Sequence, residues 1–88
     1  CLYDESRRKK ILAGPPAELR DLPVHMNEWN NYRIRCEGPR IRIWINGVQT
    51  VDFTEADPLI PLNGIIALQI HGNLVNEVHY RNVRLREL

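Results

Sequence analysis

The sequence predicts an all-β fold, an antiparallel sandwich or barrel, and three observations support this prediction. Apolar and polar residues alternate over several stretches of the chain, which is the period-two pattern of strands that bury one face. Turn signals separate these stretches at intervals of about 8–12 residues, as in sandwiches and barrels. One signal is Asn46-Gly47, a strong short-range indication of a hairpin. The 88 residues suffice for one small domain.

Residues 5–28 lie between a short strand end at 1–4 and the strand-rich region 29–88. They are charged, contain Pro15, Pro16 and Pro23, and show no sustained period. We expect a long loop here, although an element hidden in this segment would explain the pattern equally well. Long loops inside compact domains are often functional.

Five strands are expected after residue 28, in the order of the chain. "NNYRIRCEG" alternates, Gly38-Pro39 turns into "RIRIWIN", and "VQTVDF" returns after Asn46-Gly47. "TEADPLIPLNG" is a proline-rich loop, and "GIIALQIHG" and "VHYRNVRLREL" are the last two strands. In the last strand the alternation changes phase at Asn82, which predicts a β-bulge there.

The alternation sorts these side chains onto two faces. One face is expected to be core and holds Tyr32, Ile34, Ile41, Ile43, Ile45, Ile66, Leu68 and Ile70. The other displays Arg33, Arg35, Arg42, Trp44, Gln69 and His71, with Asn46 at its rim. An aromatic ring stacks on the apolar face of a sugar, while amide, guanidinium and imidazole groups bond its hydroxyls. A solvated arginine face, or a Trp44 covered by the 5–28 loop, would give the same pattern.

Charge and residue spacing exclude or disfavour several classes of function. Twelve Lys and Arg stand against 11 Asp and Glu, so the chain has no general signature of a nucleic-acid binder. No apolar run reaches the roughly 18 residues of a membrane span. The histidines have no metal-ligand spacing, and no acidic pair specifies glycoside cleavage. Cys1 and Cys36 lie far apart and are expected to be free thiols, although a disulfide depends on geometry.

Four stretches together resemble a known family: "LYDESRR", "EWNNYRIRCEGPRIRIWINGVQTVDFTE", "GIIALQIHG" and "VHYRNVRLREL". They are similar to the 3-keto-disaccharide hydrolase domain family (domain of unknown function 1080). The resemblance implies a concanavalin A-like jelly roll, a two-sheet β-sandwich. It also implies that residues 1–88 are a partial domain, the C-terminal half. Another chain, or a second copy of this one, is then expected to complete the sandwich.

The same resemblance implies a function for the polar face: hydrolysis or elimination of glycosidic bonds in 3-keto sugars. Trp44 would stack on the sugar, and Gln69 and Arg42 would bind its oxygens. His71 would be the base or a ligand of a divalent metal, and Arg81 would stabilise charge. A periplasmic or extracellular location is implied as well. A non-catalytic carbohydrate-binding module and a protein-interaction domain of the same fold are the alternatives.

Overall fold

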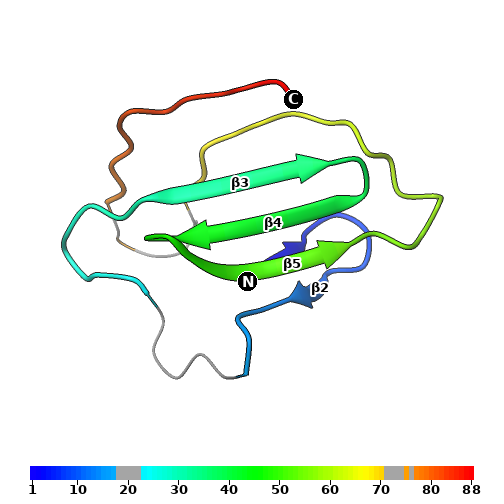
Figure 1. Ribbon diagram of the computed structural model, residues 1–88, viewed down its shortest axis with the longest axis horizontal. Coiled ribbons are helices and arrows are strands. Elements are labelled where there is room, and N and C mark those ends of the chain that lie inside the picture. Colours follow the sequence, from blue (N-terminus) through cyan, green and yellow to red (C-terminus); the bar gives the residue numbers. More distant parts are fainter. Residues whose placement is uncertain (18–22, 71–74, 76) are drawn as a thin grey trace.

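The computed structural model describes residues 1–17, 23–70, 75 and 77–88, which form two small antiparallel sheets and no helix (Figure 1). β1 (Leu2–Asp4) pairs with β2 (Lys10–Ala13) in the first sheet. The second sheet has the order β3-β4-β5 and consists of Tyr32–Glu37, Arg40–Ile45 and Val48–Thr54. The all-β prediction is confirmed. In the part of the chain just named, no helix could cross a membrane.

Two tight turns build the three-stranded sheet, and both are where the sequence predicts them. Asn46 and Gly47 have φ values of 50° and 82°, the left-handed pair that a two-residue hairpin of type I′ requires. Between β3 and β4, Gly38 has a φ of 52°, which most other residues would adopt only with strain. Both turns leave β3, β4 and β5 as consecutive neighbours.

The register of the sheet confirms its two faces. Ile34 lies opposite Ile43, which lies opposite Val51, while Arg33 lies opposite Trp44. Since directly paired residues share a face, each face is continuous across the sheet. The apolar face holds Tyr32, Ile34, Cys36, Ile41, Ile43, Ile45, Val48, Val51 and Phe53. Among the described apolar residues, however, only Ile43 (5% exposed) and Val51 (2%) are fully buried.

A β-bulge interrupts the β4–β5 ladder beside Trp44. Trp44 pairs with Gln49, but its neighbour Ile43 pairs with Val51, so Thr50 is an extra residue on β5. Thr50 is 2% exposed, and its hydroxyl donates to the carbonyl of Ile43 at 3.4 Å. Bulges re-aim side chains and increase local twist.

The bulge expected at Asn82 is not seen, because no described strand includes that residue. Asn82 nevertheless has a left-handed φ of 55°. The alternation of apolar residues therefore changes phase at a residue with left-handed backbone. A β-bulge would also require a hydrogen-bonded partner strand, and none of the described strands pairs with this segment.

The expected loop 5–28 contains a strand, β2, and this part of the prediction is wrong. The Asp4 carboxylate accepts hydrogen bonds from the amides of Ser6 and Arg7, at 3.2 and 3.0 Å, and so organises the turn after β1. Lys9 takes a left-handed φ of 52° before β2 begins. Residues 5–9 of the charged run form the hairpin loop, and Lys10–Ala13 forms the returning strand.

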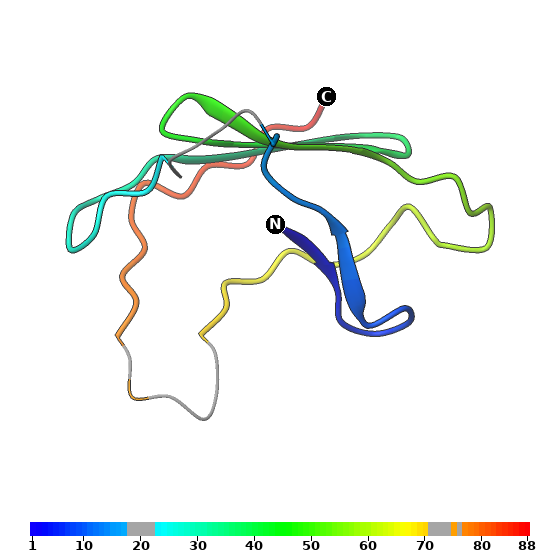
Figure 2. The same ribbon diagram turned by 90° about the horizontal axis from the view of Figure 1, so that it is seen from below.

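An arginine clamps this hairpin to the end of β5. Arg8 donates from Nε to Asp4 (2.7 Å) and from both Nη atoms to Glu55 (2.6 and 3.1 Å). These bonds from Arg8 hold the pKa values of both carboxyl groups below their ordinary range. Figure 2 shows the hairpin and the segment around residues 60–70 on one side of the β3–β5 sheet. Leu2 and Phe53 line a common cavity there, so this side is the apolar face.

The stretches 64–72 and 78–88 are expected to be strands, but their described residues belong to no sheet. Alternation indicates extended backbone, yet a strand also requires a hydrogen-bonded neighbour. The expected burial of Ile66, Leu68 and Ile70 is also wrong, since all three are exposed. Tyr32 (57% exposed) and Ile34 (54%) are likewise uncovered, because among the described residues no second full layer packs on them.

Candidate functional site

Trp44 is half-buried on the polar face of β4, where two arginines lie against its ring. The guanidinium carbon of Arg33 is 5.2 Å from the ring centroid, and that of Arg42 is 5.6 Å away. Arg33 is the direct cross-strand neighbour of Trp44, and Arg42 lies two residues earlier on the same strand. Both distances are within the range of cation–π attraction. The tryptophan therefore supports two cations on the face that it shares with them.

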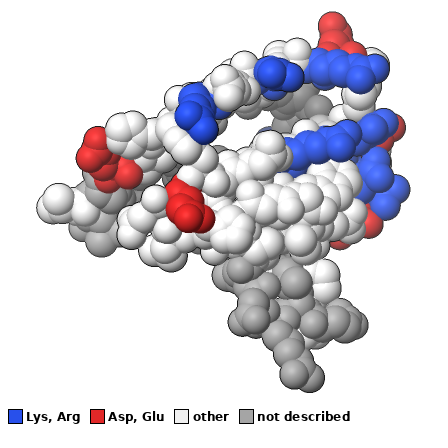
Figure 3. Space-filling view, turned by 60° about the vertical axis from the view of Figure 1, so that its left-hand side comes forward, with Lys and Arg blue, Asp and Glu red and all other residues white. Residues whose placement is uncertain are grey.

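Ion pairs fix the remaining charges of this face. Glu37 accepts from Arg35 (2.6 Å) and from Arg42 (2.7 Å), and its pKa is lowered chiefly by the hydrogen bond from Arg35. Arg40 donates from Nε and Nη2 to the two carboxylate oxygens of Asp52, at 3.0 and 2.8 Å, and these bonds lower the pKa of Asp52. Four arginines thus face two ionised carboxylates. Figure 3 shows Lys and Arg side chains in a row across the molecule and in a second row along its upper edge.

Arg42 keeps one donor unused. Its Nε atom is buried and has no hydrogen-bond partner among the described residues, although its Nη2 atom bonds Glu37. A buried donor without a partner is unfavourable by about 1–3 kcal/mol. The described residues therefore satisfy the guanidinium of Arg42 only in part.

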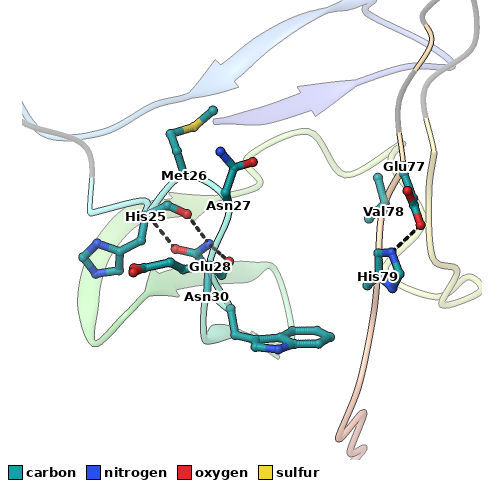
Figure 4. A pocket seen from close by; sticks show the side chains of 9 residues that line it. His25, Met26, Asn27, Glu28, Asn30, Glu77, Val78 and His79 are labelled. Atoms are coloured by element: carbon teal, nitrogen blue, oxygen red, sulfur yellow. Dashed lines mark hydrogen bonds and ion pairs between the residues drawn. The ribbon is translucent and has the colours of Figure 1, made fainter.

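A cleft of about 490 Å³ lies at the other candidate site, between residues 25–30 and residues 77–79 (Figure 4). This volume is within the usual range for small-molecule sites. One wall carries His25, Met26, Glu28 and Asn30, the other carries Glu77, Val78 and His79, and Asn27 and Trp29 complete the lining.

Asn30 shapes the first wall. Its side-chain oxygen accepts from the amide of His25 (2.7 Å), and its Nδ2 donates to the carbonyls of His25 (2.9 Å) and Glu28 (3.0 Å). Asn27, within the same turn, has a left-handed φ of 57°. The side chain of Asn30 thus satisfies three backbone groups of the turn, which are outside any sheet.

Asn46 joins this wall to the sheet. Its Oδ1 accepts from the amide of Asn31 (2.8 Å), and its Nδ2 donates to Asn30 Oδ1 (2.9 Å) and to the carbonyl of Pro23. Its backbone amide also donates to the carbonyl of Asn31 (2.8 Å). The hairpin turn that follows Trp44 on β4 is therefore also the anchor of the cleft.

The second wall is held by different contacts. The imidazole of His79 lies 2.6 Å from a carboxylate oxygen of Glu77, and both side chains are exposed. Tyr80 donates its hydroxyl hydrogen to the carbonyl of Gln69 (2.6 Å), which links this wall to residues 65–70. The Arg81 guanidinium lies over Trp29, 3.9 Å from the ring centroid, and so joins the two sides of the cleft.

The structure brings together two of the five predicted site residues, Trp44 and Arg42. Arg81 stacks on Trp29 instead. Gln69 lies on the exposed segment 65–70, where its carbonyl accepts the bond from Tyr80. His71 lies outside the described residues. The roles assigned to these side chains therefore stay predictions.

The cleft residues come from segments about fifty positions apart in the sequence and have no shared spacing, so sequence reasoning missed them. Trp29 and Arg81 do lie in the stretches "EWNNYRI" and "YRNVR" on which the family resemblance depends. That both residues lie in stretches matching the family was the one signal in the sequence that could have pointed to this cleft.

Potential metal ligands and the two cysteines lie apart in the part of the chain that is described. Within residues 1–17, 23–70, 75 and 77–88, no three His, Cys, Asp or Glu side chains converge so as to hold a metal ion. Cys1 and Cys36 are exposed and are not joined to each other, which agrees with the expected free thiols.

Comparison with known proteins confirms the resemblance. The 3-keto-alpha-glucoside-1,2-lyase-like domain matches residues 2–86, almost the whole chain. Neither a curated protein nor a solved structure gives a significant match.

Proposed function

We propose that this chain, which belongs to the 3-keto-alpha-glucoside-1,2-lyase-like domain family, acts on glycosidic bonds of 3-keto sugars or related carbohydrates. The family suggests a carbohydrate-active role. The observation that carries the finer proposal is the half-buried ring of Trp44 with two guanidinium groups beside it. The ring offers an apolar surface for a sugar, and the arginines offer donors for oxygens in the plane of that sugar.

The proposed reaction is an elimination. A ketone at C3 acidifies the hydrogen on C2, so a base can remove that proton and leave an enolate. The C1–O bond then breaks, its electron pair leaves with the glycosidic oxygen, and that oxygen takes up a proton. Water adding across the resulting C1–C2 double bond completes a net hydrolysis. Cationic donors stabilise the enolate oxygen, which is a role suited to Arg33 and Arg42.

The proposal gives the other predicted residues the roles that the resemblance implies. Gln69 binds a hydroxyl or the keto oxygen, Arg81 stabilises charge, and His71 is the base or a metal ligand. These roles require that Gln69 and Arg81 reach the sugar bound at Trp44. A domain in which residues 65–70 and 77–88 are paired strands would meet this requirement.

Such a domain is the jelly-roll sandwich, and we propose that another chain or a second copy of this one completes it. The support is the exposed apolar face around Tyr32 and Ile34, together with the extended, unpaired segments 65–70 and 77–88. Apolar faces and unpaired edges of this kind are typical of interaction surfaces. In amide hydrogen exchange, slow exchange within 65–70 and 77–88 would support the sandwich, and exchange at the rate of free peptide would contradict it.

Turnover of a 3-keto-disaccharide by the purified protein tests the proposed reaction. We expect cleavage by the unsubstituted protein, weakened cleavage with Trp44→Ala and none with His71→Ala. Arg40→Gln is the matched control, because Arg40 shares the polar face but pairs with Asp52. A parallel reaction with chelator tests for a divalent metal. Sugar binding without cleavage would favour the non-catalytic binding module. The absence of both sugar binding and cleavage would refute the carbohydrate proposal.

A further inference from the structure

We propose that the cleft between residues 25–30 and 77–79 is a second carbohydrate site, which takes one neutral sugar ring against Trp29. This rests on the proposed function for the class of ligand. It concerns the side chains around Trp29, and it shares with the Trp44 face only Arg81, which lies over Trp29 in the structure. The cleft is also proposed to discriminate between ligands by charge, because it would exclude acidic sugars.

Trp29 provides the stacking surface. It is 51% exposed, so much of its ring is accessible. The Arg81 guanidinium, 3.9 Å from the ring centroid, covers one face and restrains the orientation of the indole. An aromatic ring that is held before the ligand arrives loses less conformational freedom on binding. Arg81 is therefore a positioning residue for Trp29.

The polar groups of the cleft suit hydroxyls. His25 and Glu28 belong to one wall, and Glu77 and His79 belong to the other. Carboxylates accept hydrogen bonds from hydroxyls, and a neutral imidazole has one donor and one acceptor. Because Glu77 is bonded to His79, one ring nitrogen of that histidine is occupied and the other is left for a ligand. Met26 and Val78 add apolar lining.

Charge selects a neutral ligand. Glu28 and Glu77 place two carboxylates on the lining, against the one guanidinium of Arg81 at its edge. A uronate or a phosphorylated sugar would bring a further negative charge to a lining that already carries two carboxylates, which is unfavourable. A divalent cation is a poorer candidate, because among the described residues no three metal-ligating side chains converge.

The two walls share an anchor with the Trp44 face. Asn46 follows β4, the strand of Trp44, and its side chain bonds Asn30 and Pro23 of the first wall. Both candidate sites therefore depend on the same hairpin turn. Each nevertheless has its own tryptophan, and these are the two tryptophans of the sequence, so the sites can be observed separately.

The test is ¹⁹F NMR of the protein labelled with 5-fluorotryptophan, titrated with methyl glucoside and with glucuronate. Trp29→Phe and Trp44→Phe assign the two resonances. We expect methyl glucoside to shift the Trp29 resonance with saturation, also in Trp44→Phe. We expect glucuronate to shift it at least tenfold more weakly. Glu77→Gln should narrow that difference several-fold, whereas Glu87→Gln, an exposed acid outside the cleft, should leave it unchanged.

The outcomes separate the two proposals. A shift of the Trp44 resonance alone, or equal responses to methyl glucoside and glucuronate, would overturn the cleft proposal and leave the proposed function standing. A Trp29 shift without any 3-keto-disaccharide turnover would support the cleft and refute the proposed reaction. Arg81→Gln tests the positioning role of Arg81, because this variant keeps Trp29 and its resonance. We expect it to weaken the shift that methyl glucoside causes at the Trp29 resonance.

Discussion

Asn46 is the residue whose substitution tests most directly how the fold supports the sites. Its side chain makes three hydrogen bonds, to Asn31, Asn30 and Pro23, and its backbone adopts a φ of 50°. Replacement by glycine removes the side chain but retains the left-handed turn, which glycine adopts readily. Replacement by alanine removes the side chain and also opposes the turn.

The two substitutions should therefore differ by a known amount. Hydrogen bonds contribute about 1 kcal/mol each, so Asn46→Gly is expected to lower the free energy of unfolding by about 2–4 kcal/mol. A left-handed conformation costs a residue with a Cβ roughly 1–2 kcal/mol more than it costs glycine. The free energy of unfolding of Asn46→Ala should therefore be below that of Asn46→Gly by this amount. Asn27→Gly is the matched control: Asn27 has a similar φ, and its side chain makes no hydrogen bond within the described residues.

Urea denaturation followed by tryptophan fluorescence measures these free energies, and amide exchange over residues 23–31 locates the effect. We expect faster exchange in that segment for both Asn46 variants and little change for Asn27→Gly. A loss below about 0.5 kcal/mol in Asn46→Gly, the ordinary range for surface substitutions, would refute the reasoning. So would unchanged exchange over 23–31.

Three further predictions follow from the packing and charges. Because Arg8 lowers the pKa values of Asp4 and Glu55, the unfolded chain binds more protons. The stability that these groups contribute should be complete above the ordinary carboxyl pKa of about 4 and fall as acid protonates the folded carboxylates. Arg8→Met should flatten this dependence in an acid titration of hairpin exchange. Val51→Ala, at a 2% exposed position, should cost about 1.5–3 kcal/mol in urea denaturation; a loss near zero would show that the core lies elsewhere. The open apolar face should cause concentration-dependent association in sedimentation, which Ile34→Lys should weaken; a monomer at all concentrations would contradict this.

Local chemistry made the centre of the fold predictable. Gly38 and the Asn46-Gly47 pair specify turns through their own backbone preferences, and the alternation between them assigns each side chain to a face. These signals need only neighbours in the sequence. The β1–β2 hairpin was missed because its signal is a side-chain cap, Asp4 bonding Ser6 and Arg7, within a stretch that reads as charged loop.

Burial and site assembly were less predictable, because both depend on distant segments. Period two indicates that Ile66 and Leu68 share a face, but not that anything covers this face. Similarly, Trp29 and Arg81 meet across more than fifty positions, and no spacing rule joins them. The bulge at Thr50 was not predicted, although two polar residues, Gln49 and Thr50, separate Val48 from Val51 and change the phase of the alternation there.

The arginines on Trp44 bear on whether a sugar can bind there at all. A cation–π contact at an exposed site contributes about 0.5–1 kcal/mol, so displacing one guanidinium from the ring is a small cost. Even millimolar sugar binding corresponds to about −4 kcal/mol, which exceeds that cost several-fold. A displaced guanidinium also keeps its donors for the oxygens of the sugar. Arg33 and Arg42 are therefore compatible with a ligand on Trp44. Removing them would expose more of the ring, but the loss of their hydrogen-bond donors should lower the affinity for the sugar on balance.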